Sequence, residues 1–147
     1  MKNIALILGF MFLSYIGLFS QDETEKFVKD FKHAIEIKDT NQILEITNFP
    51  FYSYDEEKDV IDIQNLVSFK KTIVSYFFSQ DFYYFIFRSA RLQKASSELS
   101  SKTLLKINET DKKELLLLNF DFGSLVFKKI EGKIKMTAGI WIPIDKD

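Results

Sequence analysis

The spacing of apolar residues changes along the chain, and this change constrains the fold more than any other feature. In residues 22–78 apolar side chains recur every three or four positions, which predicts amphipathic helices. In residues 103–142 they alternate with polar side chains, which predicts strands. Because the helices come first and no repeat or linker divides the 147 residues, we predict one α+β domain with helices packed on an antiparallel sheet.

Three helices are predicted in the first half. The first covers residues 22–38 and the second, much shorter, starts at residue 39 and ends before the Asn48-Phe49-Pro50 corner. Asp22 and Asp39 are the predicted N-caps, because each is followed three residues later by Glu or Gln. The third helix begins near Asn65 and is the clearest amphipathic segment.

The strands are predicted from shorter patterns. A brief strand over residues 51–54 and a charged turn over 55–59 separate the second and third helices. Residues 81–94 are apolar on all sides, so they fit a buried helix and a buried strand equally well. Four strands follow, at residues 103–108, 114–121, 125–130 and 133–142.

The last two strands are predicted to form a hairpin around Glu131-Gly132, where Gly permits the positive φ of a two-residue turn. The even-numbered residues of the last strand are apolar and are expected on the core face, with Gly139 and Trp141 on the outer face. Gly139 then indicates a bulge or a close approach by another backbone, which would suit a dimer contact. Pairing outward from the turn predicts Phe127 opposite Met136, Leu125 opposite Ala138, and Lys128 opposite Lys135.

Residues 1–20 have the layout of a secretory signal peptide. Lys2 is followed by an apolar run over residues 4–13 and then by small residues that end at Ser20. We expect cleavage before Gln21 and export of residues 21–147 to the periplasm or the medium. The alternative is a retained membrane anchor, although the apolar stretch of 16 residues is just shorter than the ~17 to 25 residues that span a bilayer.

Composition excludes several classes of chemistry. The chain has no Cys and a single His, His33, so disulfides, thiol nucleophiles, zinc clusters and a Ser/His/Asp triad are not expected. Lys and Arg number 20 against 21 Asp and Glu, which leaves no basic excess for nucleic acid. No cofactor and no metal is predicted. Aromatic residues make up 16% of the chain, which predicts an aromatic core.

Several segments together resemble the nuclear transport factor two-like superfamily, in particular its small exported bacterial members. The resemblance covers about residues 23–142 and rests on Phe27-Val28-Lys29-Asp30-Phe31 with Ala34-Ile35, Asn48-Phe49-Pro50-Phe51, Phe69, and the hairpin segment from Phe127 to Lys133. It implies a cone-like, cystatin-like roll, in which a curved antiparallel sheet wraps around the helices and leaves a pocket at the open end. It also implies frequent dimerisation through the sheet. Ile134 stands where many such domains have Trp.

Enzymes of this superfamily often use a His-Asp pair, or an isolated Asp with a Tyr, inside the cone. His33 is expected on the solvated side of the first helix, which argues against a base built on it. Asp121 lies between two Phe residues, so desolvation could raise its pKa toward that of a general base. The alternative is that Asp121 is an outward strand residue or begins a turn. Asp62 is a weaker candidate that more plausibly caps the third helix.

Ligand-pocket candidates are the side chains with an apolar body and a polar tip. These are Tyr52, Tyr54, Tyr83, Tyr84 and Trp141. Arg88, with Arg91 three residues later, would share a helix face and could bind a carboxylate or phosphate. The alternatives are core positions for the aromatic residues and a solvated basic turn for the arginines.

These observations predict an exported non-catalytic binding or interaction module of unknown specificity. Its partner would be a small apolar ligand or an envelope protein. Two alternatives stay open at this point. One is an enzyme that uses Asp121 with a Tyr as acid and base on a hydrophobic substrate. The other is a structural homodimer.

Overall fold

The computed structural model describes residues 19–88, 90–94 and 99–142 and confirms the α+β class. Most of the predicted signal segment, and the side chain of Arg88, lie outside the described residues. The helices are α2 (Gln21–Glu36), α3 (Thr40–Glu45), α4 (Leu66–Phe77), α5 (Gln80–Arg88) and α6 (Ser101–Lys106), with a 3-10 turn η1 (Lys112–Glu114). The strands are β1 (Thr47–Asp55), β2 (Val60–Gln64), β3 (Arg91–Lys94), β4 (Leu115–Phe120), β5 (Gly123–Ile130) and β6 (Lys133–Trp141).

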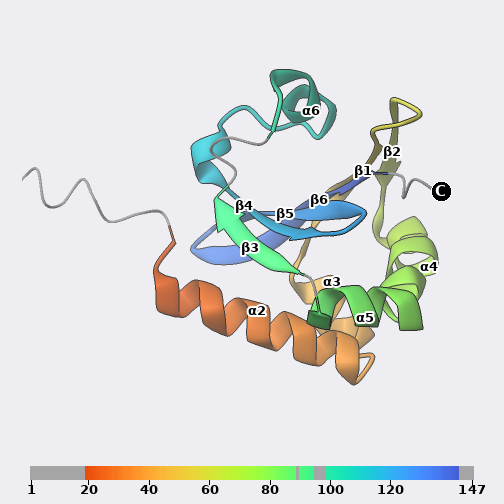
Figure 1. Ribbon diagram of the computed structural model, residues 1–147, viewed down its shortest axis with the longest axis vertical. Helices are drawn as coiled ribbons and strands as arrows, with labels where there is room; N and C mark the ends of the chain where they lie inside the picture. The colour runs from red at the N-terminus through yellow and green to blue at the C-terminus, as the bar shows by residue number, and fades with distance from the viewer. Residues whose placement is uncertain (1–18, 89, 95–98, 143–147) are drawn as a thin grey trace, which may run out of the picture.

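The six strands form one curved sheet in the order β2-β1-β6-β5-β4-β3. Helices α2, α3 and α5 lie against one side of it, and α6 lies on the other (Figure 1). Neighbouring strands are antiparallel except β1 and β6, which run parallel, whereas an antiparallel sheet throughout was expected. The two edges of the sheet are β2 and β3.

Capping residues set where the first three helices begin. The Ser20 side chain accepts from the backbone N–H of Glu23, so α2 starts at Gln21 and the predicted N-cap Asp22 lies inside its first turn. Asp39 caps α3 as predicted. Asn65 caps α4 with a reciprocal capping box, which confirms the predicted start of the third helix.

The segment over residues 103–108 is helical, not a strand as predicted. Ser100 caps α6, and Thr103, Leu104 and Ile107 are buried on one side of it. That spacing belongs to a helix, but six residues are too few to distinguish it from alternation. The cap at Ser100 was the missed signal.

Residues 81–94, which fitted either structure, contain both. Phe82 and Ile86 are four residues apart on the buried side of α5, and the chain then enters β3. Strand β2 was not predicted, and β1 is longer than residues 51–54. The charged turn between these two strands is where the sequence predicted it.

The β5–β6 hairpin confirms the predicted turn and two of the three predicted pairs. Phe127 lies opposite Met136, and Lys128 lies opposite Lys135. The third pair is wrong, because Thr137 is an extra residue in β6 and Val126, not Leu125, faces Ala138.

This bulge also reverses the predicted faces in the second half of β6. Ile134 and Met136 face the helices, whereas Ala138 and Ile140 face α6. Trp141 consequently lies on the helix side and not on the outer face. A strict period of two cannot anticipate the change, because one inserted residue exchanges the two sides of a strand.

The space between the helices and the sheet is filled by phenylalanine. Six rings there are no more than 1% exposed, and most meet a neighbour edge to face, the favoured geometry for aromatic pairs. These residues are Phe31, Phe51, Phe69, Phe77, Phe82 and Phe127. This packing confirms the predicted aromatic core.

Gly139 is buried beneath the indole of Trp141. A Cβ at this position would lie 2.6 Å from the indole ring. The indole Nε1 donates to the Ser53 hydroxyl over 2.7 Å, which fixes the ring in place. The glycine therefore allows the ring to fold back over its own strand.

We predict that Gly139→Ala displaces this indole and destabilises the protein by about 1 to 3 kcal/mol, as overpacking does elsewhere. Because Trp141 is the sole tryptophan, its fluorescence maximum reports the displacement directly. Urea unfolding gives the free energy. Ser53→Ala is the control that removes the hydrogen bond without crowding the ring. Unchanged fluorescence and stability in Gly139→Ala would contradict this packing.

Candidate functional site

A group of aromatic side chains gathers around Tyr76 on the helix side of the sheet. The ring of Tyr76 meets those of Phe82, Phe122 and Trp141 edge to face, at centroid distances of 5.2, 6.2 and 5.6 Å. Phe120 packs against the same group. Burial raises the pKa of the Tyr76 hydroxyl to about 12, which makes it a poor acid near neutral pH.

Asp121 does not enter this aromatic group. It lies in the two-residue turn between β4 and β5 and is exposed to solvent. The neighbouring side chains, Phe120 and Phe122, turn inward and are buried. The sequence context therefore placed Asp121 among aromatic residues, but the turn separates its carboxylate from them.

The remaining sequence-predicted candidates are spread over the molecule. Tyr52 and Tyr54 lie on the α6 side of the sheet, and Trp141 lies on the helix side. Tyr83 and Tyr84 are exposed on α5. Arg91 begins β3, so it does not share a helix face with Arg88 at the end of α5. Asp62 lies in β2 and accepts a hydrogen bond from Gln64, and it does not cap α4.

A groove that the sequence did not predict lies along α2. It has a volume of about 510 Å³, within the roughly 300–1,000 Å³ typical of small-molecule sites. Its apolar surface comes from Val28 of α2, Phe87 of α5 and Leu92 of β3, and its polar rim is Glu25, Lys29, Lys32, His33 and Glu36. We call this the α2–β3 groove.

A second hollow of about 440 Å³ continues the groove toward the start of α2. The two share Glu25 and Leu92. The second lobe is lined by Phe19, Ser20, Gln21, Thr24, Gln93 and Leu116 in addition to these two. Together the two hollows form an elongated depression that is lined by residues of α2 and of the edge strand β3. Figure 1 shows how these two elements are placed.

Exposed aromatic rings border the groove. Phe87 is 41% exposed, and its ring stacks on Tyr83 with centroids 4.5 Å apart. Tyr84 is also exposed on the same helix. Exposed aromatic rings beside an apolar depression are typical of binding surfaces. His33, 62% exposed as predicted, lies on the rim with Nδ1 3.7 Å from the carboxylate of Glu36.

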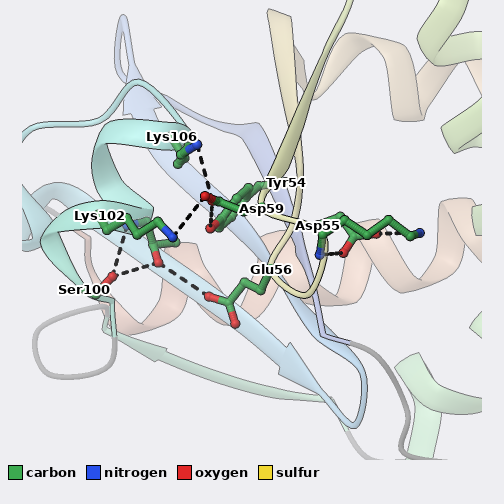
Figure 2. A network of polar contacts seen from close by, with 9 residues as sticks. Tyr54, Asp55, Glu56, Asp59, Ser100, Lys102 and Lys106 are labelled. Carbon is green, nitrogen blue, oxygen red and sulfur yellow. Dashed lines mark hydrogen bonds and ion pairs between the residues drawn. The ribbon is translucent and has the colours of Figure 1, made fainter.

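A polar network holds α6 on the opposite face of the sheet. Asp59, in the β1–β2 turn, accepts from the Tyr54 hydroxyl at 2.9 Å and pairs with Lys102 at 3.1 Å and Lys106 at 3.3 Å. Glu56 of the same turn accepts from Thr103 over 3.4 Å. Figure 2 shows these side chains converging from the turn and from α6.

The electrostatics of this network favour a structural role over acid and base catalysis. The hydrogen bond from Tyr54 and the two lysines lower the pKa of Asp59 to about 2. The same bond to Asp59 raises the pKa of Tyr54, and the bond from Lys102 raises the pKa of that lysine. Each group is held in its ordinary charge state, whereas general acid and base catalysis requires pKa values close to the working pH.

The Asp59 contacts predict an acid-dependent loss of stability. Its pKa is about 2 when folded and ordinarily 3.8, so its contribution is complete above the ordinary value and disappears as pH falls through about 2. At neutral pH, Asp59→Asn should have a lower thermal midpoint than the native protein. As pH falls through this acid range, the midpoint of Asp59→Asn should fall by less than that of the native protein. Asn also tolerates the positive φ of 51° at this position.

Circular dichroism melting curves across this pH range measure the effect. Asp121→Asn is the matched control, because it makes the same change in an exposed turn and should keep the native pH dependence. Equal pH dependence in Asp59→Asn and the native chain would contradict a role for Asp59 in holding α6.

Helix α6 covers part of the sheet face opposite the phenylalanine core. Leu99, Leu104 and Ile107 pack there on Tyr54, Leu115, Leu117, Val126, Ala138 and Ile140, and all nine are buried. Lys128 pairs with Glu109 at 3.0 Å and with Glu114 at 3.5 Å, whereas Lys135, opposite it in the ladder, donates to the backbone carbonyl of Glu45. A dimer through this part of the sheet would require contact over α6 or its displacement.

No protein-family model and no curated protein matches the chain. Among solved structures, the chain is similar to one described as a calcium/calmodulin dependent protein kinase II association domain from Xanthomonas campestris. The two are 8% identical, the alignment covers 88% of this chain and 91% of that chain, and the TM-score is 0.43. Within the described residues, no group of His, Cys, Asp and Glu could hold a metal, and no helix is long and apolar enough to cross a membrane.

Proposed function

We propose that the protein is an exported, non-catalytic binding module that holds a small apolar ligand in the α2–β3 groove. The groove is the observation that carries this proposal. It combines an apolar floor, exposed aromatic rings and a volume in the range of ligand sites. An internal pocket is a poorer site for the ligand, because phenylalanine fills the space between the helices and the sheet.

We also propose membership of the nuclear transport factor two-like superfamily. The helices that precede a curved sheet support this proposal, as does the hairpin around Gly132. Under this proposal the ligand binds at the surface between α2 and β3 and not in the interior. The position of Asp121 in an exposed turn and the charge states around Asp59 favour binding over catalysis.

Filling the groove tests the binding proposal. We predict that the native protein binds the neutral apolar probe N-phenyl-1-naphthylamine with an increase in fluorescence. Val28→Trp should weaken this binding by about tenfold or more, because the larger side chain occupies the apolar floor. Val67→Trp is the control, since Val67 is 75% exposed at the start of α4 and outside the groove.

Two outcomes would contradict the proposal. One is that the native protein does not bind the probe, and the other is equal binding by Val28→Trp and the native protein. Thermal unfolding of both variants shows whether the fold is retained, so that loss of binding is not confused with unfolding.

Export is tested by the mass of the chain recovered outside the cytoplasm of a bacterial host. We predict the mass of a product that begins at Gln21. Leu8→Lys should prevent export by interrupting the apolar run, whereas Leu105→Lys, on exposed α6, should not. A full-length product in the membrane fraction would contradict cleavage. Cleavage at this position would remove Phe19 and Ser20 from the second lobe and so open it.

A further inference from the structure

The lysines of α2 differ in whether a carboxylate lies beside them. Lys26, on the same helix but outside the groove, has the Asp30 carboxylate 2.5 Å away. In contrast, neither Lys29 nor Lys32 has a carboxylate within 4 Å among the residues that the structure describes. Within the part of the chain that the structure describes, the ammonium groups of Lys29 and Lys32 therefore lack an ion-pair partner.

The two acidic residues of the rim, Glu25 and Glu36, contact other side chains of α2. Glu25 accepts from the side-chain amide of Gln21 at 2.9 Å. The carboxylate of Glu36 lies beside His33. Glu25 lies four residues before Lys29, and Glu36 lies four residues after Lys32. Among the described residues, Glu25 and Glu36 therefore contact Gln21 and His33 and form no ion pair with the two lysines.

The apolar floor lies directly beside these cations. The ammonium of Lys32 is 5.7 Å from the centroid of the Phe87 ring, so a positive charge sits over the floor of the groove. Val28 and Leu92 continue the apolar surface from there, and Leu116 continues it in the second lobe. From Lys32 to Gln21 the helix rises roughly 16 Å, which is the length of a medium-chain acyl group.

We propose that the ligand is a free single-chain amphiphile with an anionic head group, of the fatty-acid carboxylate class. Lys29 and Lys32 bind the carboxylate, and the acyl chain lies over Val28 and Leu92 toward the second lobe. This inference rests on the proposed function and adds the chemistry of the head group. Charge complementarity selects this occupant, because an apolar ligand with a cationic head would meet the two lysines unfavourably.

Three probes with one tail and different heads test the inference. Dodecanoate, dodecanol and dodecyltrimethylammonium are titrated below their aggregation concentrations and followed by calorimetry and by the methyl NMR shifts of Val28 and Leu92. We expect dodecanoate to bind about tenfold more tightly than dodecanol, the effect of one or two charge-assisted contacts. The cationic probe should bind most weakly.

The double variant Lys29→Gln/Lys32→Gln should abolish the difference between dodecanoate and dodecanol while leaving dodecanol binding unchanged. Lys26→Gln, which removes a paired lysine from the same helix, should keep the difference. If the double variant does not fold, a salt titration of the native protein replaces it. Rising ionic strength should then weaken binding of dodecanoate and not of dodecanol.

The outcomes separate the two proposals. Equal binding of all three probes would overturn the head-group inference and leave the proposed function standing. Binding of none of them, or binding that does not shift Val28 and Leu92, would overturn both. Sedimentation with phosphatidylglycerol vesicles, together with no binding of free dodecanoate, would overturn the inference in favour of a lipid surface.

Discussion

The packing of phenylalanine rings between the helices and the sheet is the interaction on which the rest of the structure depends. Phe31 of α2 meets Phe77 of α4 and Phe127 of β5, so one ring joins two helices to the middle of the sheet. A chain without disulfides gains its stability from such burial. The same rings fill the space between the helices and the sheet.

Much of the fold could be predicted because local signals agreed with the tertiary arrangement. Asp39 and Asn65 mark helix starts by capping, and Gly132 marks a turn by its positive φ of 77°. The errors arise where a short pattern has two interpretations. Residues 103–108 are too few to define a period, and the bulge at Thr137 depends on the partner strand and leaves no mark on the alternation.

The candidate site could not be predicted in the same way. Val28 and Leu92 lie 64 positions apart in the sequence, and only the placement of the edge strand β3 beside α2 brings them to one groove. Of the polar-tipped aromatic residues chosen from the sequence, Tyr83 is exposed and stacks on Phe87, which lines the groove. Residue type alone does not show which of them share a surface, and Tyr54 and Trp141 lie on opposite faces of the sheet.

Apolar packing holds both sides of the sheet, and the charged contacts that accompany it differ. On the helix side, apolar rings exclude water. On the other side, a helix of six residues is tied partly by exposed contacts between Asp59 and two lysines. Dissolved ions weaken exposed charge pairs and leave apolar contacts intact or strengthened. In concentrated brine the Asp59 contacts would therefore weaken, while the buried apolar residues beneath α6 would keep that helix on the sheet.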